Sequence, residues 1–79
     1  MSKEHTVFVT VRGARHRVNY TRHTGGPFRV VYHVHDAFGR VVMHGGKCHE
    51  ATEGEIMGYA HDSLNTGYKT GKLPIPDFC

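Results

Sequence analysis

The chain alternates apolar and polar residues over four short segments, a pattern typical of strands whose sheet has one buried and one solvated face. The alternation predicts strands over residues 6–12, 15–22, 28–35 and 40–44. The side predicted to face the core carries Val7, Val9, Val11, Val18, Tyr20, Phe28, Val30, Tyr32, Val34, Val41 and Met43. The opposite side collects the basic and imidazole side chains Arg12, Arg15, Arg17, Arg29, Arg40, His33, His35 and His44.

Glycines mark the turns between these segments. Gly13 and Ala14 fit a type II′ hairpin turn, which has glycine at its first central position. Residues 36–39 supply a second tight reversal with glycine where a positive φ is expected. The two turns predict the cross-strand pairs Val9–Val18, Val34–Val41 and Tyr32–Met43.

A helix is predicted after the strands, over residues 52–65. Thr52 followed by Glu55 has the spacing of a capping box, and Gly67 suits the C-terminal cap. Gly58 lies inside the helix, where we expect it to permit close approach to the sheet. The apolar stripe that would cover the sheet consists of Ile56, Met57, Ala60 and Leu64.

The tail is predicted to be extended over residues 68–79, and residues 73–78 cannot be helical because prolines interrupt them at Pro74 and Pro76. We expect an extended strap along the sheet or the helix. The predicted architecture is a single α+β domain over residues 1–79, a four-stranded antiparallel meander with one C-terminal helix on one face. The first and fourth strands would be its edges, which leaves a monomer and an edge-paired homodimer both open.

Size limits the chemistry of the chain. A domain of 79 residues buries roughly 60% of its unfolded surface, which supports one core and no elaborate active site. We therefore expect a non-enzymatic protein without a cofactor. Cys48 and Cys79 are too few and too far apart for a secreted disulfide framework, which favours reduced thiols in the cytoplasm with one disulfide as the alternative. No segment reaches transmembrane length.

Charge is distributed unevenly along the chain. The net charge is +3, but residues 1–40 hold seven Lys and Arg against two acidic residues, and residues 41–79 hold three against five. Basic strands beside an acidic helix predict a dipolar surface that attracts an acidic partner. Eight histidines make the charge of that surface sensitive to mild acid.

The basic face is the candidate binding surface, and its partner is either protein or nucleic acid. A solvated face without any ligand is the alternative, because the open side of an antiparallel sheet is usually polar. Arginines with interleaved Phe8 and His33 suit phosphate contact and base stacking. Val31 and Val42, adjacent on the same face, favour a protein or ribonucleoprotein partner, because an apolar centre ringed by arginine suits an interface. The predicted partner-binding set is Arg12, Arg15, Arg17, Arg29, Arg40, Phe8, Val31, Val42 and His33.

A metal site is a further alternative. Imidazole and thiolate are zinc ligands, and the candidates are His33, His35, His44 and Cys48. The chain has neither CxxC nor HExxH spacing, and histidines on a polar sheet face account for the same pattern.

From Phe28 onward the chain resembles the small domain of HicB-type antitoxins. Two strands, a polar turn ending near Thr52 and a helix are followed by Gly71-Lys72-Leu73-Pro74-Ile75-Pro76, where that family often has a glycine and then Pro-Ile-Pro. The resemblance covers about half the chain and implies a toxin-neutralising protein that acts by occlusion. In size and architecture the chain is also similar to phage-encoded inhibitors of host defence, including anti-CRISPR proteins. Both likenesses imply a stoichiometric inhibitor.

Overall fold

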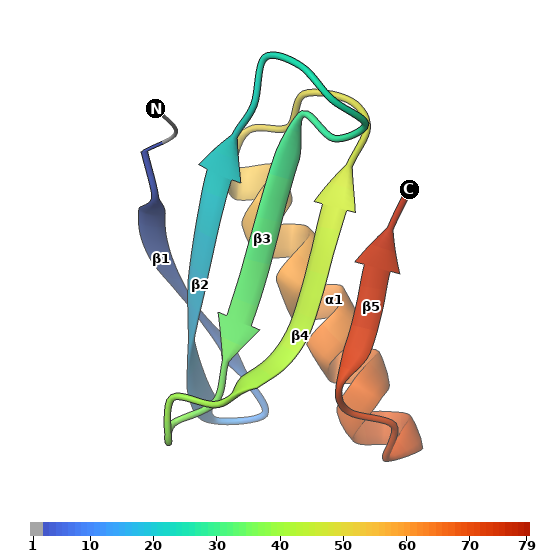
Figure 1. Cartoon of the computed structure of the whole chain (residues 1–79). Helices are drawn as coiled ribbons and strands as arrows, with labels where there is room; N and C mark the ends of the chain where they lie inside the picture. The colour runs from blue at the N-terminus through green and yellow to red at the C-terminus, as the bar shows by residue number, and fades with distance from the viewer. Residues whose placement is uncertain (1–2) are drawn as a thin grey trace.

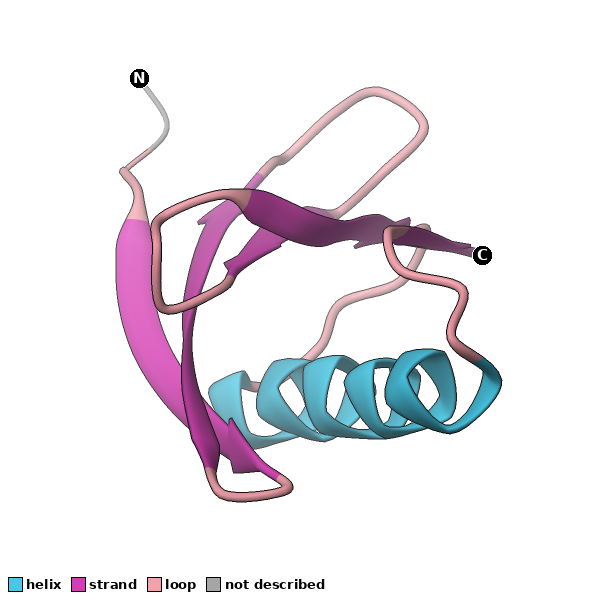
Figure 2. Cartoon of the chain, turned by 90° about the horizontal axis from the view of Figure 1, so that it is seen from below, coloured by secondary structure: helices cyan, strands magenta, loops and turns pink. Residues whose placement is uncertain are grey.

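The computed structural model describes residues 3–79, which form five strands and one helix. The elements along the chain are β1 (His5–Val11), β2 (Ala14–Arg22), β3 (Val30–His35), β4 (Val41–Lys47), α1 (Glu53–Thr70) and β5 (Ile75–Phe78). The strands lie in the sheet in chain order, with β1 to β4 antiparallel and β5 parallel to β4. α1 lies against one face of this sheet (Figures 1 and 2).

The predicted α+β class is confirmed, whereas the four-stranded antiparallel sheet is wrong. The tail predicted as an extended strap is instead a fifth strand, because α1 carries the chain back along the sheet and the tail then runs in the same direction as β4 (Figure 1). A helical crossover of this kind is the usual connection between parallel strands. The first strand is an edge of the sheet, as predicted, but the other edge is β5 rather than the fourth strand.

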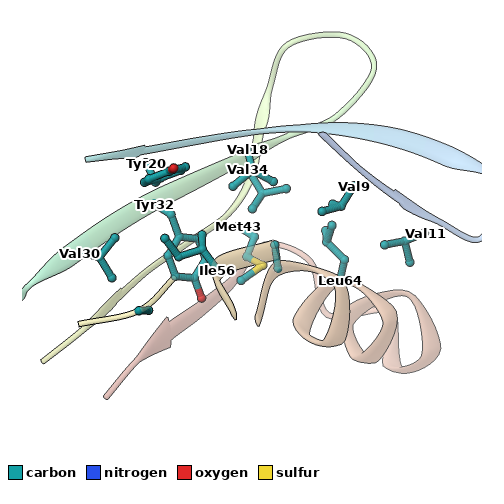
Figure 3. Close-up of a cluster of buried hydrophobic side chains, with 12 residues drawn as sticks. Val9, Val11, Val18, Tyr20, Val30, Tyr32, Val34, Met43, Ile56 and Leu64 are labelled. Atoms are coloured by element: carbon teal, nitrogen blue, oxygen red, sulfur yellow. The ribbon is translucent and has the colours of Figure 1, made fainter. Parts of the chain in front are cut away.

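The core lies between the sheet and α1 (Figure 3). Alternate residues of the strands are buried, as predicted for Val9, Val11, Val18, Tyr20, Val30, Tyr32, Val34 and Met43. The helix contributes Ile56, Ala60 and Leu64, each with no exposed surface, and Met57 packs against the cluster. The apolar stripe predicted for the helix is therefore confirmed.

Arg12 and Gly13, rather than Gly13 and Ala14, form the turn of the first hairpin. Both have positive φ, 50° and 79°, which defines a type I′ turn rather than the predicted type II′. The observed pairs include Val11–Ala14, Val9–His16 and Val7–Val18. This register differs from the predicted one by two residues. Because side chains alternate with a period of two, the shift leaves the predicted faces of both strands unchanged.

A β-bulge changes the second hairpin. The observed pairs are Tyr32–Gly45, Val34–Met43 and His35–Val41, which replace the predicted Val34–Val41 and Tyr32–Met43. Val42 is the extra residue of the bulge, so the two valines exchange their predicted roles. Val41, expected in the core, is 46% exposed, and Val42, expected on the solvated face, packs against the core.

The helix begins as predicted and ends later. The Thr52 hydroxyl accepts a hydrogen bond from the Glu55 amide, and the Glu55 carboxylate accepts one from the Thr52 amide, which confirms the capping box. Gly71, with φ of 69°, is the C-terminal cap, whereas Gly67, predicted for that role, is a buried helical residue. Within residues 3–79 we find no helix whose length and hydropathy together suit a bilayer span.

A hydrogen-bond network fixes β5 to the rest of the sheet. The hydroxyl of Tyr32, a fully buried residue, donates to the Asp77 carboxylate, and Lys47 Nζ donates to the other carboxylate oxygen at 3.2 Å. Burial, together with the neighbouring carboxylate, raises the pKa of Tyr32, so its hydroxyl remains a neutral donor. The Lys47 ammonium also lies 4.7 Å from the centre of the Tyr59 ring on α1. The network thereby connects β3, β4, β5 and the helix.

The fourth strand is longer than the predicted range of residues 40–44. β4 continues through Gly45 and Gly46 to Lys47, because Gly45 sits where Tyr32 and the backbone of Asp77 both approach β4. Gly58, by contrast, is exposed, and a side chain there would meet no atom within 4 Å. The close approach expected at Gly58 is therefore wrong, and the close approach occurs at Gly45.

These two glycines make a matched pair of alanine substitutions. A Cβ at Gly45 would clash with the Asp77 backbone oxygen and lie 2.7 Å from the Tyr32 hydroxyl oxygen, so Gly45→Ala should lower the free energy of unfolding by at least about 2 kcal/mol. Gly58→Ala should raise it by about 1 kcal/mol, because alanine favours an exposed helix. Urea denaturation followed by circular dichroism measures both. A Gly45→Ala variant as stable as the wild type would contradict the placement of β5.

Candidate binding face

One face of the sheet is open. α1 covers the other face, and no further element of residues 3–79 lies over this one (Figures 1 and 2). We call it the open face. Among its exposed or half-buried side chains are Phe8, Arg15, Arg17, Val31, His33, His35, Val41 and His44.

A hollow of about 450 Å³ lies on the open face at the β1–β2 end. Its lining residues are Phe8, Arg15, Arg17, Asp36, Ala37 and Gly39, and we call it the basic hollow. The Arg15 guanidinium carbon lies 3.9 Å from the centre of the Phe8 ring, within the range of a cation–π contact. Arg17 is directly opposite Phe8 in the β1–β2 ladder. The hollow is therefore lined by an aromatic ring, that of Phe8, which is 44% exposed, and by two arginines.

The Asp36 carboxylate lines the hollow but is engaged in its own turn. Asp36 Oδ1 accepts hydrogen bonds from the amides of Phe38 and Arg40, each at 2.9 Å, and Oδ2 accepts one from Arg40 Nε at 3.1 Å. The backbone hydrogen bond from Arg40 is the largest of the effects that hold the pKa of Asp36 below its ordinary value. Because Arg40 is its ion-pair partner, Asp36 leaves the charges of Arg15 and Arg17 available to a ligand.

The other predicted arginines do not join the hollow. Arg12 Nε donates to Asn65 Oδ1 on α1 at 3.2 Å, so this side chain reaches toward the helix layer. Arg29 Nη1 donates to the Thr24 carbonyl, within the loop between β2 and β3. The period-two pattern gave no signal for either contact, because both depend on how far a flexible side chain reaches.

The predicted apolar centre is also different. Val31 is half-buried on the open face, but Val42 packs against the core because of the bulge. Two valines side by side were the reason to favour a protein partner over nucleic acid. Only Val31 of that pair remains on the open face.

A second group of side chains on the open face is aromatic. We call Phe28, His33, His44 and Phe78 the aromatic cluster. Phe28 and Phe78 have ring centres 5.3 Å apart, His44 and Phe78 5.5 Å, and His33 and His44 6.4 Å. Phe28 was predicted in the core, but it is half-buried and lies over β4 at Gly46, where a Cβ would come within 3.0 Å of its ring. Phe78 is 47% exposed.

Sequence reasoning missed Phe78 because the tail was not recognised as a strand. In a strand over this tail, Pro76 and Phe78 would share one side, because side chains alternate with a period of two. In the observed pairing His44 is opposite Pro76 and Gly46 is opposite Phe78. A strand assignment would have placed this ring on the open face.

The residues of the metal alternative do not gather into a site. His33 pairs with His44, whereas His35 pairs with Val41, and its buried Nδ1 has no hydrogen-bond partner among residues 3–79. Cys48 lies beyond the end of β4, next to Cys79. Within the described part of the chain, no group of three or more His, Cys, Asp or Glu side chains is arranged to hold a metal ion.

Comparison with known proteins finds no family, no curated protein and no solved structure that matches the chain. The chemistry of the open face is therefore the basis on which a function is inferred.

The turn beside the hollow predicts a specific pH dependence. The pKa of the Asp36 carboxyl is lower in the folded protein than in the unfolded chain. Asp36 therefore stabilises the fold at pH values above its pKa in the unfolded chain, and this stabilisation is lost as the pH falls through its pKa in the folded protein. In an NMR titration the Asp36 carboxyl should titrate below 3.8, and the amide protons of Phe38 and Arg40 should follow the same curve. Titration at or above 3.8 would show that these hydrogen bonds do not form.

Proposed function

We propose that the protein is a non-enzymatic inhibitor or adaptor that binds an acidic protein or nucleoprotein partner stoichiometrically through the open face. The observation that carries the proposal is the basic hollow, in which Arg15 rests on Phe8 beside Arg17 while the nearby carboxylate of Asp36 is bonded to Arg40. Arginine and aromatic residues are the types that dominate binding energy at protein interfaces. Arg15 and Arg17 form no ion pair with a carboxylate of residues 3–79, and two such guanidinium groups favour an acidic partner.

Preorganisation supports binding at this place. The stacking of Arg15 on Phe8 restricts a long side chain before any partner arrives, which reduces the conformational entropy lost on association. Phe38, 85% exposed at the tip of the neighbouring turn, lies 5.7 Å from the Arg40 guanidinium carbon and adds a second Arg–aromatic pair near the rim. The site therefore combines charge for attraction with apolar surface for affinity.

The small size of the chain and its open face favour an inhibitor over other kinds of binding protein. A sheet face that stays uncovered in the monomer can occlude a partner surface without chemistry. The resemblance to HicB-type antitoxins and to phage-encoded anti-defence proteins supports the same role, which would be exercised in the cytoplasm.

Charge reversal tests the proposal. We expect Arg15→Glu/Arg17→Glu to reduce by at least about tenfold the amount of partner protein that stays bound after nuclease treatment. The reason is that both cations of the hollow are replaced by anions, which repel an acidic partner. The measurement is a pull-down from nuclease-treated lysate of the cells in which the protein acts, quantified by mass spectrometry.

The matched control is Lys69→Glu/Lys72→Glu. It changes the net charge by the same amount at the C-terminal end of α1, on two exposed residues outside the open face. This variant should retain the partner. Equal loss in both variants would indicate attraction by net charge alone, and no loss in the Arg15/Arg17 variant would place the binding face elsewhere.

The aromatic cluster favours single-stranded nucleic acid as a second candidate partner. Bases stack on exposed aromatic rings of a sheet while arginines contact phosphates, and such stacking contributes about 1–3 kcal/mol per base. Phe78, beside Phe28 and His44, offers a ring of this kind on the same face as Arg15 and Arg17.

Salt dependence separates this candidate from the first. The probe is a fluorescein-labelled single-stranded oligothymidylate, and the measured quantity is its association constant K at several salt concentrations. If Arg15 and Arg17 neutralise two phosphates, log K should fall with log salt with a slope of roughly −1.4. Phe78→Ala should weaken this binding by about fivefold or more through lost stacking. A flat salt response, or affinity that Phe78→Ala leaves unchanged, would eliminate the nucleic-acid candidate.

A further inference from the structure

The two cysteines lie at the same end of two adjacent strands. Cys48 directly follows β4 and Cys79 directly follows β5, and these strands run parallel, so their ends meet. The Cys79 amide donates to the Gly46 carbonyl at 3.1 Å, which continues the ladder past Phe78. The Cys48 amide donates to Cys79 Sγ at 2.9 Å. Residues that are 31 positions apart in the chain are thus brought into contact.

Both thiols are accessible and close to each other. Each cysteine is exposed and unbridged. A hydrogen bond with the Cys79 thiol is the largest effect raising the pKa of the Cys48 thiol. Two exposed cysteines at the end of a strand pair, with the backbone amide of one bonded to the thiol of the other, are candidates for a disulfide, because such a bond requires the two residues to be close neighbours.

We propose that Cys48 and Cys79 form an intramolecular disulfide on oxidation, which locks β5 against β4. With a low-molecular-weight disulfide such as oxidised glutathione as oxidant, one cysteine thiolate attacks it and releases one glutathione thiolate. The second cysteine then attacks the mixed disulfide and releases the other glutathione. The protein loses two protons and two electrons, one sulfur–sulfur bond forms, and the oxidant is reduced to two thiols.

The lock acts on a short edge strand. β5 has four residues, and it is held by its pairing with β4 and by the contacts of Asp77 with Tyr32 and Lys47. A covalent bond just beyond Phe78 would fix this ring within the aromatic cluster. Oxidation would thereby stabilise one end of the open face. An effect of the disulfide on partner binding rests on the function proposed for that face.

Equilibration in glutathione redox buffers, followed by intact-mass spectrometry after acid quenching, tests the disulfide directly. The expected product is a monomer lighter by two hydrogen atoms and free of glutathione. Its melting temperature should exceed that of the reduced protein by on the order of 10 °C, because the bond closes a long loop. Cys48→Ser and Cys79→Ser are the controls, and neither should show this change.

Accumulation of a glutathione adduct or a covalent dimer as the main product would overturn the proposed pair. Disulfide formation without a rise in melting temperature would contradict the proposal that the bond stabilises β5 against β4. The mass and melting measurements involve no partner, so they decide this inference independently of whether the open face binds anything.

Discussion

The buried hydroxyl of Tyr32 is the constraint on which the rest of the structure depends. A tyrosine with no exposed surface needs a hydrogen-bond partner inside the protein, because a buried unpaired hydroxyl is costly. The acceptor is Asp77, which comes from β5, and Lys47 balances its charge. The core is therefore complete only when the tail adds to the sheet as a parallel fifth strand. That placement brings Phe78 to the open face and Cys79 to Cys48.

Period-two and helical patterns predicted most of the fold. The faces of β1, β2 and β3 followed from alternation, and they survived a two-residue register error because the error was even. The capping box at Thr52 likewise gave the start of α1. What could not be predicted depends on contacts between distant residues. Gly45 and Gly46 are ordinary turn residues by local propensity. Only the approach of Tyr32 and Asp77 at Gly45, and of Phe28 at Gly46, explains why β4 continues through them.

The candidate site was predictable to the extent that it lies on regular strands. Phe8, Arg15 and Arg17 lie on the predicted face because β1 and β2 are regular. Val42 moved to the core side because one bulge residue reverses the alternation locally, and a bulge has no signal in this stretch of sequence. Arg12 and Arg40 do not line the hollow for a different reason. The Arg12 guanidinium donates to the side-chain amide oxygen of Asn65 on α1, and the Arg40 guanidinium donates to the Asp36 carboxylate in its own turn. Strand periodicity describes neither contact.

The arginines of the open face have two possible physical roles, which are to prevent self-association and to bind a partner. A single helix covers one face of a five-stranded sheet, so the other must be polar enough to prevent self-association. Freely solvated side chains would be sufficient for that purpose. Arg15 instead lies over the Phe8 ring, and both residues line the hollow. Ordering a long side chain costs conformational entropy, and a restriction that is already present in the free protein lowers this cost on association. The contact of Arg15 with Phe8 is therefore the feature of the open face on which the proposed binding role rests.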